Sequence, residues 1–242
     1  MDYKIFEIDP NLLNYRSDIE LRMNNYNRKK AELVGDGRTL AEFANGHLYY
    51  GFHKTNDGWI YREWAPGAER MYLTGDFCNW DRYAYPMEKK DGGVFELYIP
   101  GVDSLRNGQR VRAITVRNGV EMERIPLYAK YVLQDQATIQ WDAVIHEPEA
   151  PFVWTDKNFK PEKTLYIYEC HIGMAQEEPK IGTYTEFKDK ILPRIKALGY
   201  NTIQIMAIME HPYYASFGYQ VTNFFAPSSR FGRPEALKKL IN

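Results

Sequence analysis

The sequence predicts a multidomain chain: an N-terminal helical segment, then an all-β sandwich, then the opening of a parallel α/β fold. Three patterns predict it, namely helical apolar spacing at the start, short β-rich segments with turn residues in the middle, and strand–helix–strand at the end. The expected boundaries are a helical segment at 1–47, a sandwich at 48–133, a linker at 134–163 and an incomplete α/β portion at 164–242.

The first segment has two helix signals. Pro10 follows Asp9, and proline is tolerated in the first turn of a helix. The apolar residues that follow recur at spacings of four and three and form one stripe: Tyr15, Ile19, Met23 and Tyr26. After a break at 35–37, Thr39 and Glu42 have the spacing of a capping box, which predicts a short second helix.

The middle segment alternates short runs of Tyr, Val, Ile and Phe with turn dipeptides and tripeptides. Regular short strands with such punctuation are typical of a sandwich. Asn118-Gly119, between residues 112–117 and 120–125, predicts a tight hairpin. Residues 134–163 contain Pro, Asp and Glu without strong periodicity and are predicted to be a linker, anchored by Trp141 and Trp154.

The last segment reads as a parallel strand–helix–strand unit. A short apolar strand at 165–169 precedes a second capping box, Thr183 with Glu186, and then an apolar strand at 201–208. The apolar face of the helix between them contains Phe187, Ile191, Leu192, Ile195 and Leu198. Pro193 lies inside this helix and is expected to kink it.

Composition excludes several classes of function. With 242 residues and a net charge of −1, nothing favours binding to nucleic acid or to an anionic membrane. No apolar run approaches the ~20 residues of a membrane helix, and the polar start has no signal-type stretch. Cys78 and Cys170 lack metal-ligand spacing, so we expect no metal and no cofactor. The expected location is cytoplasmic.

Aromatic residues make up 15% of the chain, which leaves two interpretations. Aromatic side chains fill β-rich cores well. They also offer flat apolar faces to the C–H groups of sugars, while Tyr and Trp keep a polar group for hydrogen bonding. Composition alone does not choose between a packed core and a sugar-binding surface.

Two long motifs carry a family resemblance. Residues 63–68 (EWAPGA) with 73–80 (LTGDFCNW) resemble the β-sandwich carbohydrate-binding module that precedes the catalytic barrel in branching and debranching enzymes. Residues 192–204 (LPRIKALGYNTIQ) and 206–220 (MAIMEHPYYASFGYQ) resemble the first helix, second strand and following loop of the barrel in glycogen and starch branching enzymes. Residues 168–173 (YECHIG) resemble the first barrel strand, where Ser is commoner than Cys170.

The resemblance implies an immunoglobulin-like sandwich followed by the truncated start of a (β/α)8 TIM barrel. It implies a retaining transglycosylase of the α-amylase superfamily that moves an α-1,4-linked glucan to a 6-hydroxyl. Such chemistry requires a carboxylate nucleophile and a carboxylic acid/base. No carboxylate in this chain, including Glu169 and Glu210, matches either motif. We therefore expect no catalytic residue here, an inactive chain, and an α-1,4-glucan as partner.

The same resemblance gives the candidate substrate-binding residues. Tyr219, after Gly218, matches the superfamily tyrosine that stacks on the sugar next to the cleaved bond; the alternative is a tyrosine packed on the barrel top. His211, Tyr214 and Gln220 belong to the same loop and either line the groove or brace the loop.

Trp80 matches the tryptophan that stacks on glucan in related glycogen-binding modules. Arg112 stands in for a lysine there, but no Trp follows the Asn118-Gly119 turn, where those modules place a second ring. Trp80 therefore either contacts glucan or packs between strands.

Two other functions stay open: a debranching enzyme, which shares the module-plus-barrel order, and a non-catalytic glucan-binding protein. An unfinished parallel sheet has exposed edges, so self-association through the incomplete barrel is expected.

Overall fold

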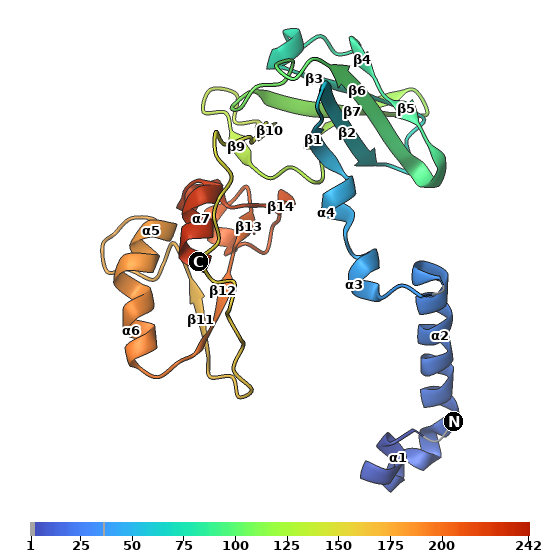
Figure 1. Ribbon diagram of the computed structural model, residues 1–242, viewed down its shortest axis with the longest axis vertical. Helices are drawn as coiled ribbons and strands as arrows, with labels where there is room; N and C mark the ends of the chain where they lie inside the picture. The colour runs from blue at the N-terminus through green and yellow to red at the C-terminus, as the bar shows by residue number, and fades with distance from the viewer. Residues whose placement is uncertain (1–2, 36) are drawn as a thin grey trace. The chain divides into compact units, whose positions relative to one another are not determined.

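The computed structural model describes residues 3–35 and 37–242 and divides into two units, Met1–Tyr49 and Tyr50–Asn242 (Figure 1). Asp36, in the expected break at 35–37, and the polar start at Met1 and Asp2 lie outside the described residues.

The described residues of the first unit form helices joined by turns and short connections. A 3-10 helix, η1 (Pro10–Tyr15), leads directly into α2 (Arg16–Val34), and the Asp9 side chain accepts a hydrogen bond from the Asn11 amide at 3.1 Å. The short helices are α1 (Ile5–Ile8), α3 (Leu40–Phe43) and α4 (Gly46–Tyr49). The apolar stripe of α2 is not buried: Ile19 and Met23 are half-buried and Tyr26 is exposed. Val34 is the one buried residue of this helix.

The capping box predicted from Thr39 and Glu42 is present at the start of α3. The Thr39 hydroxyl accepts from the Glu42 amide at 3.2 Å, and the Glu42 carboxylate accepts from the Thr39 amide at 2.7 Å. Two amide groups that the helix itself leaves without partners are thereby satisfied.

The second unit begins with two antiparallel sheets. The first has the order β1-β2-β6-β5 and the second β4-β3-β7-β10-β9, with β8 also pairing with β7. The strands of the first sheet are β1 (Gly51–Lys54), β2 (Gly58–Trp64), β5 (Glu88–Lys89) and β6 (Val94–Pro100). Those of the second are β3 (Arg70–Gly75), β4 (Tyr85–Pro86), β7 (Arg110–Arg117), β8 (Val120–Arg124), β9 (Val132–Gln134) and β10 (Trp141–Val144).

Alternate side chains of the two sheets form one core, which confirms the predicted sandwich. Tyr61 and Phe95 from the first sheet and Leu73, Val111 and Ala113 from the second have no exposed surface. Burying one such large apolar side chain stabilises the fold by roughly 1.5–3 kcal/mol.

The predicted hairpin at Asn118-Gly119 is confirmed. Arg117 of β7 pairs with Val120 of β8, and the two turn residues have φ angles of 51° and 74°. Positive φ at both positions is what a tight hairpin turn requires, and Asn and Gly tolerate it best.

The second sheet continues past residue 133, the boundary expected from the sequence. β10 pairs with both β7 and β9 in the stretch expected to be a linker. Asp142 lies in the middle of β10 and is buried, with its carboxylate 2.5 Å from Arg112 Nε and 3.2 Å from Arg110 Nη1. A charged residue at a buried position hides the apolar pattern of a strand, so no strand can be recognised there from local pattern alone.

The parallel strand–helix–strand unit follows. β11 (Ile167–His171) pairs in parallel with β12 (Thr202–Met206), from Ile167 opposite Thr202 to His171 opposite Met206. The connection contains α5 (Tyr184–Glu186), a π-helical turn η4 (Phe187–Ile191) and α6 (Leu192–Ala197). Pro193 cannot donate to the carbonyl four residues earlier, and the helix widens into the π turn just before it. Tyr184, Phe187, Ile195 and Phe231 form the core of this part.

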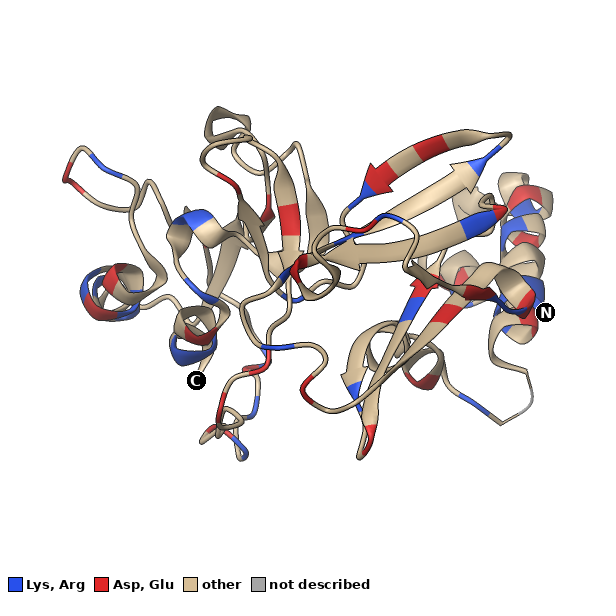
Figure 2. Ribbon diagram, turned by 90° about the horizontal axis from the view of Figure 1, so that it is seen from above, with Lys and Arg blue, Asp and Glu red and all other residues tan. Residues whose placement is uncertain are grey.

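The chain ends in a short antiparallel pair and a helix. β13 (Met209–Glu210) pairs with β14 (Asn223–Pro227), followed by η6 (Ser229–Phe231) and α7 (Pro234–Ile241). In the described part of the chain, no helix has the length and hydropathy needed to cross a membrane. Figure 2 shows acidic and basic residues interspersed along the elements.

Candidate functional site

Residues 211–222, between β13 and β14, form what we call the aromatic loop. The loop follows the carboxyl end of β12, and ligands of parallel α/β folds bind at that end of the strands. It includes the 3-10 turn η5 (Tyr214–Ser216). Three of its rings face solvent: Tyr219 is 83% exposed, Tyr213 59% and Phe217 43%. A mobile ring would bind weakly, so the contacts that fix this loop determine what it can do.

Tyr219 is presented to solvent by a strained turn. Phe217 and Gly218 both have positive φ angles, 50° and 79°, and the Tyr219 amide donates to the Ser216 carbonyl at 3.0 Å. A Cβ on Gly218 would lie 2.4 Å from the Cα of Ala207, which directly follows β12. Only glycine therefore allows the loop to lie against the end of this strand and hold Tyr219 outward.

A buried carboxylate joins the start of the aromatic loop to the segment that follows β14. Glu210 has no exposed surface. It accepts from the His211 amide at 3.1 Å, the Ser229 amide at 2.7 Å and the Ser228 hydroxyl at 3.4 Å. Burial raises the pKa of Glu210, and the hydrogen bonds from Ser229 and His211 act against that rise. Glu210 therefore fixes the start of the loop to the segment that follows it.

His211 braces the loop from within. It has no exposed surface, and its Nδ1 lies 3.0 Å from the Met209 carbonyl, which places the proton on Nδ1. Arg230 donates to the His211 and Pro212 carbonyls at 3.3 and 2.6 Å. A direct contact between the His211 ring and a ligand is closed off in this arrangement.

His171 lies at the carboxyl end of β11, beneath the aromatic loop. Its ring meets Tyr214, Phe217 and Phe231 edge-on, with centroids 5.8, 6.2 and 5.4 Å away. Neither ring nitrogen has a hydrogen-bond partner among residues 3–35 and 37–242. Burial lowers the pKa of His171, and nearby His211 lowers it further, so the ring is held neutral in an apolar setting.

Trp80 forms a second candidate surface, on the sandwich. It follows the 3-10 turn η2 (Asp76–Cys78) and has a positive φ of 61°. Its indole N–H donates to Asp76 at 3.0 Å, and the Arg112 guanidinium carbon lies 5.3 Å from the ring centre. The side chain is 37% exposed. Trp80 is thus held by Asp76 and Arg112 and still offers part of its ring to solvent.

Arg112 connects this surface to a network of ion pairs. Besides Asp142, it contacts Glu123 at 2.9 Å, and Arg82 contacts both Glu121 and Glu123. The hydrogen bond from Arg112 lowers the pKa of Glu123. The Arg112 guanidinium is therefore fixed by the carboxylates of Asp142 and Glu123, and the Trp80 ring packs against a rigid cation.

An open groove lies between the sandwich and the aromatic loop. Its volume is about 540 Å³, and it is lined by Arg112, Gln140 and Trp141 from the sandwich and by Pro212 and Thr222 from the loop. Arg112 belongs both to this groove and to the Trp80 surface. The groove therefore joins the two candidate surfaces within the second unit.

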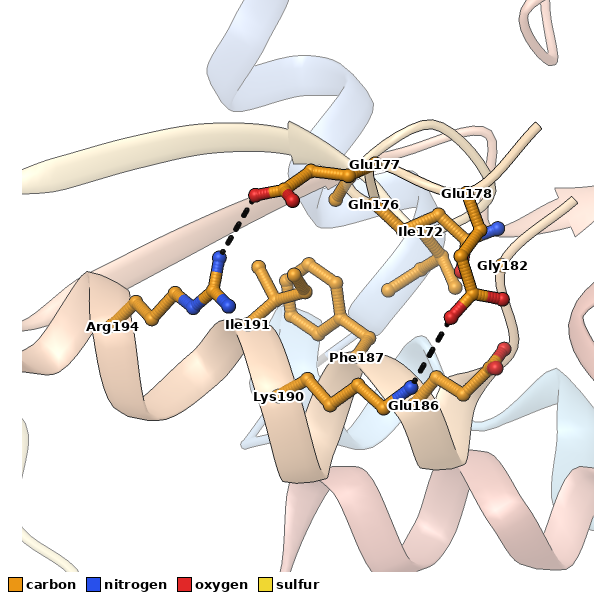
Figure 3. A pocket seen from close by; sticks show the side chains of 11 residues that line it. Ile172, Gln176, Glu177, Glu178, Gly182, Glu186, Phe187, Lys190, Ile191 and Arg194 are labelled. Carbon is orange, nitrogen blue, oxygen red and sulfur yellow. Dashed lines mark hydrogen bonds and ion pairs between the residues drawn. The ribbon is translucent and has the colours of Figure 1, made fainter. Parts of the chain in front are cut away.

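A separate pocket of about 260 Å³ lies between residues 173–182 and the α5–α6 helix (Figure 3). Ile172, Phe187 and Ile191 line it, and ion pairs from Glu177 to Arg194 (3.5 Å) and from Glu178 to Lys190 (3.7 Å) flank it. No residue of the aromatic loop lines this pocket.

Neither cysteine nor any acidic cluster suggests a metal centre. In the described ranges, no three His, Cys, Asp or Glu residues are grouped as metal ligands. Cys170 is buried, which raises the pKa of its thiol to about 11.

The structure brings four of the five sequence-predicted residues together. Tyr219 and Gln220 are exposed on the aromatic loop, Tyr214 is half-buried, and His211 lies beneath them; Trp80 lies apart, on the sandwich.

Two bracing residues are not predicted from the sequence. Glu210 is considered there only as a catalytic carboxylate, and Asn223, which joins the loop to the sandwich, is not singled out at all. A lone acid between an apolar strand and a histidine is the one available signal for Glu210.

Comparison with known proteins gives the class. Residues 49–129 match carbohydrate-binding module 48 (Isoamylase N-terminal domain). These residues include β1 to β8, so the module is the greater part of the sandwich. Most of the sandwich is thus similar to a carbohydrate-binding module.

The chain is similar to 1,4-alpha-glucan-branching enzymes over essentially its whole length. It is 41% identical to the enzyme of Equus caballus over 99% of the chain and 35% of that relative. It is 43% identical to branching enzyme 2-2 of Arabidopsis thaliana over 99% of the chain and 30% of the relative. The chain therefore spans about a third of the length of these relatives.

Solved structures share the fold at low identity. A pullulanase type I from Bacillus subtilis in complex with maltose gives a TM-score of 0.63 at 20% identity, covering 89% of this chain and 32% of that one. The catalytic module of SpuA, a glycogen-degrading pneumococcal virulence factor, gives 0.62 at 18% identity, covering 89% and 36%. These matches support the fold and do not distinguish branching from debranching.

Replacing Gly218 with alanine is expected to disturb the aromatic loop. The substitution adds backbone strain at positive φ and an overlap with Ala207, which together cost about 2–4 kcal/mol. Because the loop must move to relieve the overlap, Tyr219 should lose its position. Amide hydrogen exchange of residues 211–222 in G218A should show the change.

Gly199 provides the matched control, since it has a φ of +91° and a Cβ added there would meet no atom within 4 Å. G199A should cost only about 1 kcal/mol and leave the loop unchanged. Equal effects of G199A and G218A on the loop would contradict the role given to the Ala207 contact.

Acidification is expected to destabilise the fold through His171. Folding lowers the pKa of His171. Its contribution to the free energy of unfolding is therefore present at pH above about 6.5 and is lost as the pH falls. Glu210, with a raised pKa, acts in the opposite direction. Urea midpoints of wild type and H171Q should therefore converge between pH 7.5 and 5. A difference in urea midpoint between wild type and H171Q that does not change with pH would refute this role of His171. So would the same convergence in H47Q, since His47 is exposed.

Proposed function

We propose that the chain is the N-terminal part of a 1,4-α-glucan branching enzyme, which transfers a glucan segment from an α-1,4 to an α-1,6 linkage. One observation carries this proposal: identity of 39–43% to several branching enzymes over nearly the whole chain. The two surfaces with solvent-facing rings, Tyr219 on the aromatic loop and Trp80 on the module, support it physically.

The parallel unit β11–α5–α6–β12 is the start of the catalytic (β/α)8 barrel in this proposal. Support comes from its parallel pairing and from the position of the aromatic loop after the carboxyl end of β12, where barrel enzymes place their active sites. The expected domain order then becomes helices, module, connecting segment and incomplete barrel.

The substrate in this proposal is an α-1,4-glucan. Tyr219 stacks on a glucose ring, Gln220 hydrogen-bonds a sugar hydroxyl, and Tyr214 supports the ring from the loop interior. Trp80, on its Arg112 support, binds a second stretch of the same polymer. His211 acts through the loop and does not touch the sugar, because it is fully buried.

The chemistry in this proposal belongs to carboxylates outside the 242 residues. A retaining transglycosylase requires a nucleophile and an acid/base about 5–5.5 Å apart. Glu210, the buried carboxylate nearest the aromatic loop, is occupied by two amides and a hydroxyl. The 242-residue chain is therefore expected to bind glucan without transferring it.

A cytoplasmic location stays a prediction, since the matched relatives include a chloroplastic/amyloplastic form.

The activity is tested with amylose and the complete product of the gene. Branching of amylose conserves the number of reducing ends and lowers the iodine-staining wavelength. Hydrolysis of α-1,4 linkages raises the number of reducing ends on amylose, and debranching raises it on amylopectin, which is assayed in parallel because it contains α-1,6 branches. We expect the first result for the complete product and neither result for the 242-residue chain. A rise in reducing ends, or branching by the 242-residue chain alone, would contradict the proposal.

Glucan binding is tested separately by titrating the 242-residue chain with maltoheptaose. Y219A and W80A should each weaken binding by about tenfold, which corresponds to about 1.4 kcal/mol for the loss of a stacked ring. The control is Y166A, since Tyr166 is 61% exposed but precedes β11, at the opposite end of the strand. Equal affinities of wild type, Y219A and W80A would remove both surfaces from the proposal.

Self-association of the 242-residue chain is a further expectation. β11 and β12 form a sheet of two strands in the described part of the chain, so each has an edge without a strand partner. Leu165, Tyr166 and Leu198 near these strands are 52%, 61% and 72% exposed. Light scattering after size exclusion should give a mass that rises with concentration. A constant monomer mass would contradict it.

A further inference from the structure

The aromatic loop is joined to the sandwich by one buried side chain, Asn223. It is the first residue of β14 and is 3% exposed. Its amide nitrogen donates to the carbonyls of Pro126 and Leu127, at 3.0 and 3.2 Å. Its amide oxygen accepts from the amides of Phe225 and Ala226, both at 2.9 Å. All four hydrogen-bonding positions of the side chain are therefore used.

The sandwich side of this contact is itself fixed. The Leu127 amide donates to the carboxylate of Glu63 at 3.0 Å. Glu63, which is 1% exposed, also accepts from Tyr61 at 2.6 Å and from Arg124 at 2.5 Å. A continuous path of hydrogen bonds thus runs from the sandwich core through Leu127 to Asn223.

The loop side is equally connected. Thr222, next to Asn223, donates its amide to the Glu210 carbonyl at 2.7 Å. Glu210 in turn holds His211 and Ser229. A ring stack runs parallel to this path, since Tyr128 and Phe225 lie 4.1 Å apart at an angle of 18°. Both ends of the aromatic loop are therefore tied to the sandwich.

We propose that Asn223 is a positioning residue through which the carbohydrate-binding module fixes the aromatic loop and the direction of Tyr219. The inference rests on the proposed function for its consequence, which is that glucan binding at Tyr219 depends on the module. The module thereby serves the loop as a structural support in addition to any sugar contact of its own.

The substitution N223D separates this role from the folding of β14. A carboxylate keeps both acceptors for the Phe225 and Ala226 amides, but loses both donors and faces two carbonyl oxygens. At pH 7.5, exchange of the amides in 211–222 should rise at least tenfold relative to wild type, as expected from losing two buried hydrogen bonds. Exchange in β2 and β6 should be unchanged.

Acidification supplies a readout that a general loss of packing would not give. When protonated, the introduced carboxyl group regains one O–H donor toward the carbonyls of Pro126 and Leu127. The difference in loop exchange between N223D and wild type, compared at each pH, should therefore shrink as the pH falls to about 4. A difference that is independent of pH would overturn the assigned hydrogen bonds.

N242D is the matched control, because Asn242 also joins distant segments through its amide. Its Oδ1 accepts from the Thr155 amide at 2.6 Å and its Nδ2 donates to the Thr155 hydroxyl at 2.8 Å. N242D should leave the aromatic loop unchanged. If N223D does not fold, Y128L removes the stack on Phe225 and should accelerate exchange in the same residues.

Unchanged loop exchange in N223D, or in Y128L where N223D does not fold, would overturn the proposal. So would equal acceleration in the loop and the sandwich strands. Titration with maltoheptaose tests the consequence: affinity should fall about tenfold in N223D. If wild type does not bind this sugar but N223D still releases the loop, the proposed function fails and the positioning role stands. If wild type and N223D bind it equally, the dependence of binding on the module is refuted.

Discussion

A buried amide–carboxylate path connects the sandwich to the aromatic loop. Asn223 and Glu63 are each almost fully buried, and both are completely hydrogen-bonded, to backbone groups or to neighbouring side chains. Buried polar groups without partners would cost several kcal/mol, so such a path allows few arrangements of the parts that it connects. The sandwich, β14 and the aromatic loop therefore depend on one another, and the exposed rings gain a fixed background without losing their exposure.

Sequence patterns could predict the elements whose stability is local. The two capping boxes, at Thr39 and Thr183, and the Asn118-Gly119 turn each depend on residues within a few positions of one another, and all three are present. The parallel pairing of β11 with β12 followed from apolar runs of strand length. Tyr219 and Gln220 were chosen through the resemblance of their loop to that of a known superfamily, and both are exposed.

Features that depend on distant partners were not predictable in this way. β10 lies in a stretch that was expected to be a linker because residues 134–163 lack strong periodicity. Its buried Asp142 is acceptable in a strand because Arg110 and Arg112 on β7 pair with it. Asn223 and Glu210 look like ordinary loop residues until the chain brings Leu127 and Ser229 beside them. The close approach of Gly218 to Ala207 likewise depends on how the loop packs against the end of β12, which no local pattern shows.

If the buried path acts as described, the carbohydrate-binding module and the aromatic loop move as one body. Backbone ¹⁵N relaxation of the 242-residue chain tests this most directly, by comparing rotational correlation times of β2 and β6 with those of β11, β12 and β14. We expect one common correlation time for both groups. Two distinct times, with the shorter one in β11 to β14, would show that the parts tumble independently and would contradict the coupling.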